Sequence, residues 1–407
     1  MQPDPINIWS SVPDDLIARA ADCDPSSVAD IARLRKKFSA DHVRAALDLT
    51  LARRKAQNKF PKKIVNKFLA LPQAVEQASS YRAAKYKATR FKTCFDKDAH
   101  PSIPENRIID LCCGIGGDAL ALSQILPSPD QLLAVDIDPL RTWMCKQNTG
   151  VQTLVTDITT PTFKQTLSNF DCYHIDPARR TTAGQRLWQL ADIIPSPDYL
   201  AELVSLIPTG CTKLSPAINH DELSFPAEVE YLSEAGSLTQ ALAWTGKLAH
   251  NTSYTTATLL TKDNQTHTLT DQPTDVSSAD CSSEKEYLFT IDPSVERARL
   301  IPHLASTLNL DIIHPKLGLL TSNTLSPADQ SPFLKPYRLI AYMPWKESRI
   351  KNWLASHDAA IITIKTRDKT VNPDHLAPAL RGTGNIPYTL FILRKNKSII
   401  TYITEPL

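Results

Sequence analysis

The sequence has little of several residues that define common protein classes. Its 407 residues include only eleven glycines and eight cysteines, and the cysteines never occur as a C-x-x-C pair. Cys112 and Cys113 are adjacent, which leaves too little room for an ordinary disulfide or for two ligands of one metal. We therefore expect reduced thiols and no metal centre.

Long apolar runs are also missing. The sequence contains no stretch of 18 apolar residues, so we expect no membrane span. The first residues, M-Q-P-D-P-I-N, lack the basic start and the apolar core of a signal peptide, which favours a cytoplasmic location. A chain of this length should form two or three domains, each large enough for its own core.

Charge is spread unevenly along the chain, although the formal net charge is only +2. Residues 1–100 carry a net charge of +8, residues 101–285 of −11 and residues 286–407 of +5. An acidic centre suits a cationic ligand, whereas basic flanks suit a polyanion such as RNA. A single basic flank is more often a solvated helix face, but two flanks around one acidic centre favour nucleic acid.

Three of the eleven glycines, Gly114, Gly116 and Gly117, lie within four residues of one another. An apolar run ending in Asp110 and Leu111 precedes them, and apolar residues at helical spacing follow. This pattern predicts a strand, a glycine turn and a helix whose first amides face a ligand. Both dinucleotides and S-adenosylmethionine bind to such turns. The acid four residues before the first glycine favours S-adenosylmethionine, because dinucleotide-binding folds usually have an apolar residue there.

The stretch D-L-C-C-G-I-G-G-D closely resembles motif I of class I S-adenosylmethionine-dependent methyltransferases. It is especially similar to the RNA-modifying branch that includes the cap-trimethylguanosine synthases. The resemblance implies that the methionine part of the cofactor lies against the glycine turn and Asp110. Residues at the ends of the next two predicted strands would hold the rest, with Asp136 at the ribose hydroxyls and Asp157 at the adenine amine. The full set of expected cofactor-binding residues is Asp110, Cys112, Gly114, Gly116, Gly117, Asp136, Ile137, Asp157, Ile158 and Ser79.

A fourth strand is predicted in F-D-C-Y-H-I-D-P-A-R-R, with Asp176 and Pro177 at its carboxyl end. Class I methyltransferases keep their catalytic motif at this place. Amino-methylating families have N/D-P-P-aromatic there, and this chain lacks the second proline and the aromatic residue. We expect Asp176, or the backbone beside it at Pro177, to accept a hydrogen bond from the attacking amine. Arg179 and Arg180 either grip a substrate phosphate or pair with acids of the same domain.

Two further residues of this region bear on the chemistry. The motif D-P-A-R-R is also similar to the D-P-P-R of RNA 5-methyluridine methyltransferases, which use a cysteine nucleophile soon after strand five. No cysteine follows that strand here, and Cys211 is expected before it, so covalent carbon methylation is disfavoured. His174, within strand four, is expected to point into the core or into solvent.

Residues 1–97 are predicted to form helices, with Asp24 and Ser39 as caps. The stretch from Leu51 to Phe68 contains seven basic residues and no acid. Two aromatic residues, Phe60 and Phe68, lie among these lysines and arginines in the sequence. This pattern is typical of a nucleic-acid surface, although both rings would fit equally in a core. The candidate contacts are Arg53, Arg54, Lys62 and Lys63.

A further helix is predicted over residues 77–91. In the trimethylguanosine synthases and their relatives, a segment at this place closes over the methionine end of the cofactor. Ser79 would supply a hydroxyl there, or else cap the helix.

The C-terminal region, residues 286–407, is predicted to be a separate α/β unit. Its landmarks Y-L-F-T-I-D-P, S-P-F-L-K-P-Y and I-T-I-K-T-R resemble the THUMP-like domain found behind a methyltransferase domain in bacterial proteins. A terminal hairpin is expected about residues 395–397. THUMP domains bind RNA, so the resemblance adds RNA as an expected partner.

The predicted architecture is therefore α/β with three parts. They are a basic helical domain at residues 1–97, a Rossmann-like seven-stranded methyltransferase domain at 98–285 and a THUMP-like domain at 286–407. The expected function is methyl transfer from S-adenosylmethionine to RNA at a base nitrogen. Two alternatives stay open: a non-catalytic RNA-binding protein that keeps the fold, and a nicotinamide-dependent oxidoreductase.

Overall fold

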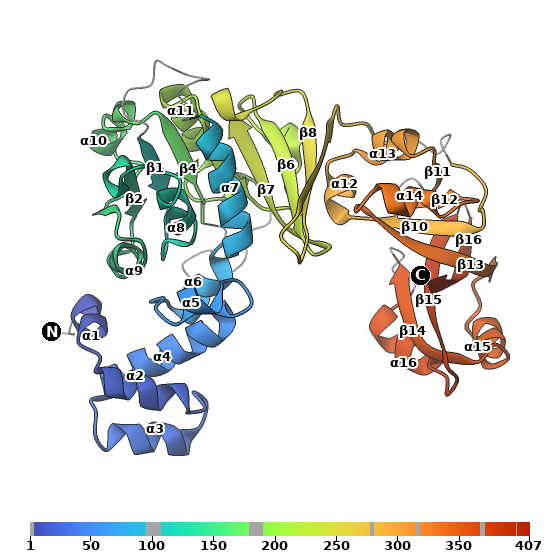
Figure 1. Cartoon of the computed structure of the whole chain (residues 1–407), viewed down its shortest axis with the longest axis horizontal. Helices are drawn as coiled ribbons and strands as arrows, with labels where there is room; N and C mark the ends of the chain where they lie inside the picture. The colour runs from blue at the N-terminus through green and yellow to red at the C-terminus, as the bar shows by residue number, and fades with distance from the viewer. Residues whose placement is uncertain are drawn as a thin grey trace. The chain divides into compact units, whose positions relative to one another are not determined.

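The computed structural model describes residues 4–94, 107–178, 190–276, 281–314, 318–366, 371–395 and 397–407. The chain divides into two compact units (Figure 1). The first comprises Met1–Glu230 and Gln240–Ser253, and the second Tyr231–Thr239 and Tyr254–Leu407. Within the described ranges, no helix combines the length and the apolar character needed to cross a membrane. Candidate RNA contacts Arg179 and Arg180 lie outside the described residues.

The chain begins with helices, as predicted. They are α1 (Pro5–Ser10), α2 (Asp14–Ala21), α3 (Val28–Arg35), α4 (Ala40–Ala56), α5 (Lys62–Val65), α6 (Pro72–Gln77) and α7 (Tyr81–Thr93). Ser39 caps α4 by accepting a hydrogen bond from the His42 amide, as expected. The cap of α3 is Ser27 and not Asp24, whose side chain accepts hydrogen bonds from Ser26 instead.

The single helix predicted over residues 77–91 is wrong. The chain leaves α6 at Gln77 and re-enters a helix at Tyr81, because Ser80 takes the N-cap position and accepts a hydrogen bond from the Ala83 amide. The interruption matters for function, since it turns residues 78–80 into a short extended connection beside the glycine turn. Gly117 lies so close that a Cβ added there would stand 3.4 Å from the Cβ of Ala78.

The strands that follow build one mixed sheet. They are β1 (Ile108–Leu111), β2 (Leu132–Asp136), β3 (Gln152–Val155), β4 (Cys172–Ile175), β5 (Gly210–Leu214), β6 (Glu228–Glu234), β7 (Ser237–Thr245), β8 (Thr255–Leu260) and β9 (Thr266–Asp271). Their order is β3-β2-β1-β4-β5-β7-β6-β8-β9. Strands β1 to β5 are parallel, and β7 is antiparallel to β5. The predicted count of seven strands is wrong, because β8 and β9 form an antiparallel hairpin that extends the sheet to nine.

The helices of this part are α8 (Gly117–Ser123), α9 (Pro139–Thr149), α10 (Pro161–Lys164) and α11 (Pro197–Leu206). Short 3-10 turns lie at Pro129–Gln131, Leu167–Asn169, Leu190–Asp192, His220–Glu222 and Gly246–Leu248. Strand β1 is fully buried and lies between β2 and β4. Because β1 to β5 are parallel, their carboxyl ends lie at one edge of the sheet. In open α/β sheets, ligands bind at this edge, where the strand order reverses direction.

The C-terminal region forms a second sheet. Its elements are β10 (Tyr287–Ile291), α12 (Pro293–Arg297), α13 (Ile301–Thr307), β11 (Asp311–His314), β12 (Leu319–Ser322), α14 (Ser326–Gln330), β13 (Leu334–Pro344), α15 (Glu347–Ala355), β14 (Ala359–Thr366), α16 (Pro373–Leu380), β15 (Ile386–Lys395) and β16 (Ser398–Pro406). The strand order is β11-β12-β10-β13-β16-β15-β14. The predicted terminal hairpin is confirmed, since Lys395 on β15 pairs with Ser398 on β16.

Candidate cofactor and active site

A cavity of about 680 Å³ lies at the carboxyl ends of β1 to β4 in the first unit. Most of the residues predicted to bind the cofactor or act in catalysis line it. These are Ser79, Asp110, Cys112, Gly114, Gly117, Asp136, Ile137, Asp157, Ile158, Asp176 and Pro177. Acids from four successive strand ends therefore share one pocket, although the sequence separates them by up to 66 residues.

The glycine turn has the backbone conformation that its sequence predicts. Gly114 has φ +54° and Gly116 φ +86°, in the left-handed region that favours glycine. A Cβ at Gly114 would meet no atom within 4 Å, so this backbone is open toward the cavity. Gly116 does not line the cavity. It lets the turn approach α9, because a Cβ there would lie 2.9 Å from the Cys145 sulfur.

Asp136 and Asp157 lie at the carboxyl ends of β2 and β3. The Asp136 carboxylate accepts hydrogen bonds from the Gly114 amide at 2.8 Å and the Asp138 amide at 3.0 Å, so it braces the glycine turn as well as facing the cavity. Asp157 accepts from the amide and hydroxyl of Thr159, and these hydrogen bonds lower its pKa. Each oxygen of Asp136 accepts one of these hydrogen bonds and keeps a lone pair for a ligand donor, whereas Asp157 Oδ1 accepts both of its bonds, which leaves Oδ2 for a ligand donor.

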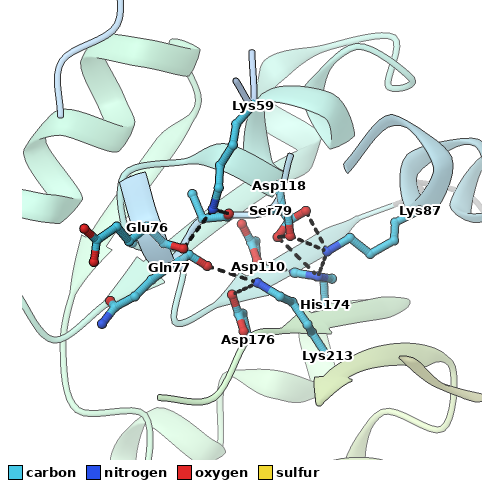
Figure 2. A network of polar contacts seen from close by, with 12 residues as sticks. Lys59, Glu76, Gln77, Ser79, Lys87, Asp110, Asp118, His174, Asp176 and Lys213 are labelled. Atoms are coloured by element: carbon cyan, nitrogen blue, oxygen red, sulfur yellow. Dashed lines mark hydrogen bonds and ion pairs between the residues drawn. The ribbon is translucent and has the colours of Figure 1, made fainter. Parts of the chain in front are cut away.

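A buried polar network lies beneath the glycine turn (Figure 2). Asp110 on β1 and His174 on β4 are paired in the sheet register, and His174 Nδ1 lies 2.7 Å from Asp110 Oδ1. The other ring nitrogen of His174 lies 3.4 Å from Lys87 Nζ on α7. The prediction that His174 points into the core is confirmed by its burial, but the residue also lines the cavity and is hydrogen-bonded to Asp110, which the sequence did not indicate.

Lys87 also joins α7 to the first turn of α8, directly after the glycine turn. Its ammonium forms an ion pair with Asp118 at 2.7 Å and contacts Ser79 Oγ at 3.1 Å. Ser79 in turn donates to the second oxygen of Asp118 at 3.0 Å. Ser79 is thus not a helix cap, since that position belongs to Ser80. It lines the cavity, as the position predicted for a cofactor contact requires.

Burial and pairing pull the ionisation of this network in opposite directions. Burial alone would lower the pKa of Lys87, but the Asp118 carboxylate raises it above its ordinary value. Burial would likewise raise the pKa of Asp118, yet Lys87 holds it far below its usual range. Burial raises the pKa of Asp110, although His174 opposes this shift. Asp110 is therefore an acid whose charge lacks full compensation inside the protein.

A second ion pair stands at the end of β4. Asp176 Oδ2 lies 2.5 Å from Lys213 Nζ on β5, and the same ammonium lies 3.4 Å from the backbone oxygen of Gln77 (Figure 2). Lys213 is only 3% exposed, whereas the Asp176 side chain is 23% exposed and lines the cavity. Lys213 therefore holds the Asp176 carboxylate from the buried side, and the exposed part of that carboxylate stays open to a ligand in the cavity.

Some basic residues of the N-terminal region form hydrogen bonds within the fold, and others are exposed. Phe60 and Phe68 are buried with their ring centres 5.0 Å apart, which confirms the alternative that both rings belong to the core and not to a nucleic-acid surface. Arg53 donates to the backbone oxygen of Phe68, and Arg54 to those of Ala21 and Cys23. Lysines at 62, 63 and 67 are exposed.

The chain is similar in sequence and in fold to known proteins. Residues 334–406 match the family described as THUMP domain-like. Two strains of Mycobacterium tuberculosis, CDC 1551/Oshkosh and ATCC 25618/H37Rv, have a relative named as an uncharacterized S-adenosylmethionine-dependent methyltransferase. It is 25% identical over 381 residues, which cover 91% of this chain and 98% of the relative. A crystal structure of a Porphyromonas gingivalis W83 protein, assigned provisionally as a methyltransferase, matches with a TM-score of 0.71 at 17% identity over 100% of both chains.

The chain has the fold of an S-adenosylmethionine-dependent methyltransferase. The THUMP-like match confirms the predicted C-terminal domain type and covers β13 to β16. S-adenosylmethionine, the expected cofactor, agrees with the named relatives and with a cavity lined by a glycine turn and strand-end acids. The finer resemblance to the cap-trimethylguanosine synthases stays a prediction, as do the domain boundaries at residues 97 and 285.

Sequence reasoning missed Lys87 and Lys213, the two lysines that organise the acids. A signal for Lys87 was present, because it falls on the same apolar stripe of α7 as Ala84 and Phe91. Lys213 had a weaker one, since it interrupts a strand that is otherwise free of charge. Neither signal identifies the carboxylate partner.

Proposed function

We propose that the protein transfers the methyl group of S-adenosylmethionine to a base nitrogen of RNA. The observation that carries the proposal is the pairing of Asp176 with buried Lys213 at the wall of a cavity that also contains the glycine turn and the strand-end acids. The Asp176 carboxylate offers a fixed hydrogen-bond acceptor for an amine. The glycine turn and the strand-end acids suit a cationic cofactor.

The cavity fits the cofactor on a specific point. Asp110 Oδ2 is buried and has no hydrogen-bond partner in the part of the chain that the structure describes, although it belongs to a residue lining the cavity. Such a group is costly unless a ligand satisfies it. The amino group of S-adenosylmethionine is a cationic donor of the required kind. Asp110 would hold that end, Asp136 the ribose hydroxyls and Asp157 the adenine amine.

The bound cofactor supplies an electrophilic methyl group on a positively charged sulfur. The protein contributes mainly position. Asp176 accepts a hydrogen bond from the substrate amine, which orients the nitrogen lone pair toward the methyl group. Lys213 holds the carboxylate in place by its ion pair. The acceptor is thus a nitrogen that carries a proton, as an exocyclic amino group does.

Thiol chemistry does not compete in this cavity. Burial, together with neighbouring Asp136, raises the pKa of Cys112 well above its ordinary value. Cys211 lies within β5, not before it as expected, and burial raises its pKa too. Only a thiolate is a competent nucleophile, so the raised pKa disfavours both groups in that role. This supports nitrogen methylation over covalent carbon methylation.

RNA as the substrate rests on two separate features. The C-terminal domain is THUMP-like, and THUMP domains bind RNA. Lys62 and Lys63 on α5, with Lys67 after it, form an exposed basic group close in sequence to α6, whose residues Gln73 and Gln77 line the cavity. Phosphate contacts from such lysines would hold the RNA backbone while the base enters the cavity.

The proposal is tested by methyl transfer in vitro. Purified protein is incubated with methyl-labelled S-adenosylmethionine and total RNA from cells that lack the gene or retain it. We expect label in RNA from the deletion cells and much less in RNA from cells with the gene, whose sites are already methylated. Cofactor binding without transfer to either RNA would favour the non-catalytic RNA-binding protein instead, to which the missing N/D-P-P-aromatic motif also points. Tight binding of a nicotinamide dinucleotide in place of S-adenosylmethionine would favour an oxidoreductase.

A further inference from the structure

We propose that Lys87 and His174 are positioning residues that hold Asp110 ready for the amino group of the cofactor. This inference rests on the proposed function, and it deepens one part of it. It concerns the buried network that joins Lys87 to the cavity-lining residues His174 and Asp110, not the groups that would touch the methyl acceptor.

The direction of each hydrogen bond follows from the chemistry of the partners. A lysine ammonium can only donate, so His174 Nε2, at 3.4 Å from Lys87 Nζ, must accept. The ring proton then resides on Nδ1 and is donated to Asp110 Oδ1 at 2.7 Å. Lys87, His174 and Asp110 thus form a chain of donors that ends at one oxygen of the carboxylate. The other oxygen, Oδ2, is the one without a partner among the described residues.

The network is secured at its far end. Lys87 is 1% exposed and lies on α7, and its ion pair with Asp118 ties this helix to α8 directly after the glycine turn. Ser79 bridges the same two charges. A fully buried lysine destabilises the fold unless it is paired in good geometry, so an apolar residue would hold the helix in place at lower cost.

The charges show why this arrangement favours a cationic ligand. Asp110, Asp118 and Asp176 face the network from β1, α8 and β4, whereas the cations are Lys87 from α7 and Lys213 from β5. With Nε2 of His174 accepting from Lys87 and Nδ1 donating to Asp110, three carboxylates face two ammonium groups. The uncompensated charge belongs to Asp110, because each lysine is already paired with another acid. A ligand ammonium at Oδ2 would complete the balance.

The test separates the amino-acid end of the cofactor from its nucleoside end. S-adenosylhomocysteine contains both ends, whereas 5′-methylthioadenosine lacks the amino and carboxyl groups. Calorimetry measures the Kd of each for wild type, His174→Leu and His174→Met, which remove the hydrogen bonds, and His174→Asn, which keeps a donor near the Nδ1 position. Lys85→Gln, at an exposed lysine of the same helix, is the matched control for a change on α7 alongside Lys87→Gln.

The leucine and methionine variants should bind S-adenosylhomocysteine at least ~10-fold more weakly, because a hydrogen bond to a charged group is lost. Binding of 5′-methylthioadenosine should stay within about threefold, which also shows that the variants fold. Lys87→Gln should behave like the leucine variant, whereas His174→Asn and Lys85→Gln should stay close to wild type.

Equal losses for both ligands, no loss for either, or an asparagine variant as weak as leucine would overturn the inference while leaving the proposed function intact. Wild-type protein that binds neither ligand would overturn the cofactor assignment and this inference with it.

Discussion

Asp176 and Lys213 allow the catalytic proposal to be separated from a purely structural role. Removing Asp176 by Asp176→Ala deletes the proposed acceptor for the substrate amine and also leaves Lys213 charged, 3% exposed and without its carboxylate. Breaking a buried ion pair from one side typically costs about 3–5 kcal/mol. We expect the lower end, because the lysine keeps its contact of 3.4 Å with the backbone oxygen of Gln77.

The double variant Asp176→Ala/Lys213→Met removes both charges at once. An apolar side chain of similar length then fills the space behind the cavity wall, so stability should return to within about 1 kcal/mol of wild type. Methyl transfer should not return. Both variants should turn over at least ~100-fold more slowly, the usual cost of losing one group that acts on the transition state.

The assays are urea unfolding for stability and single-turnover transfer of labelled methyl groups for chemistry. Affinity for S-adenosylhomocysteine should stay nearly constant in both variants, because Asp176 touches the substrate and not the cofactor. A double variant that regained both stability and turnover would refute the reasoning. Asp176 would then serve only to neutralise Lys213, and the amine would be oriented by another group, such as the backbone at Pro177. Loss of cofactor binding would place Asp176 in the cofactor site instead.

Three further outcomes are expected. Asp136→Ala should weaken cofactor binding by roughly 30–150-fold in calorimetry, equivalent to ~2–3 kcal/mol, and binding within about threefold of wild type would reject its role at the ribose. Asp110→Asn should bind S-adenosylhomocysteine more weakly yet raise the thermal midpoint of the unliganded protein. Burial raises the Asp110 pKa, so its ionised form opposes folding, and the stability gap should widen as pH rises above about 4; an unchanged midpoint at pH 7 would contradict this. Neutralising Lys62 and Lys63 should reduce the slope of log affinity for RNA against log salt concentration by about two phosphate contacts. Neutralising the exposed lysine pair 36–37 should leave this slope unchanged; equal slopes for both double variants would place the RNA surface elsewhere.

The glycine turn and the strand-end acids were predictable because they follow local rules. A parallel strand directs its carboxyl end to the ligand edge, so an acid at or just beyond the end of each strand can be placed from the sequence alone. Asp110, Asp136, Asp157 and Asp176 all line the same cavity for this reason. Strand β9 was missed because the expected fold finishes at seven strands, although its residues alternate between exposed and half-buried as in an edge strand.

The lysine partners were not predictable, because they are long-range pairs. Lys87 lies 31 residues before Asp118 in the sequence, and Lys213 lies 37 residues after Asp176. A charge count also cannot tell which basic residues already form hydrogen bonds or ion pairs within the protein. Arg54 looked available for RNA, but its guanidinium donates to two backbone oxygens at the end of α2 and beyond it.

The most direct test of the central claim is the nucleoside composition of cellular RNA. RNA from cells with and without the gene is digested to nucleosides and compared by mass spectrometry, with a strain carrying Asp176→Ala as the matched inactive control. The account predicts one nucleoside, methylated on a base nitrogen, that is present in wild type and absent from both the deletion and the Asp176→Ala strain. Identical nucleoside profiles in all three strains, or a missing methyl group located on a ribose or on a base carbon, would contradict it.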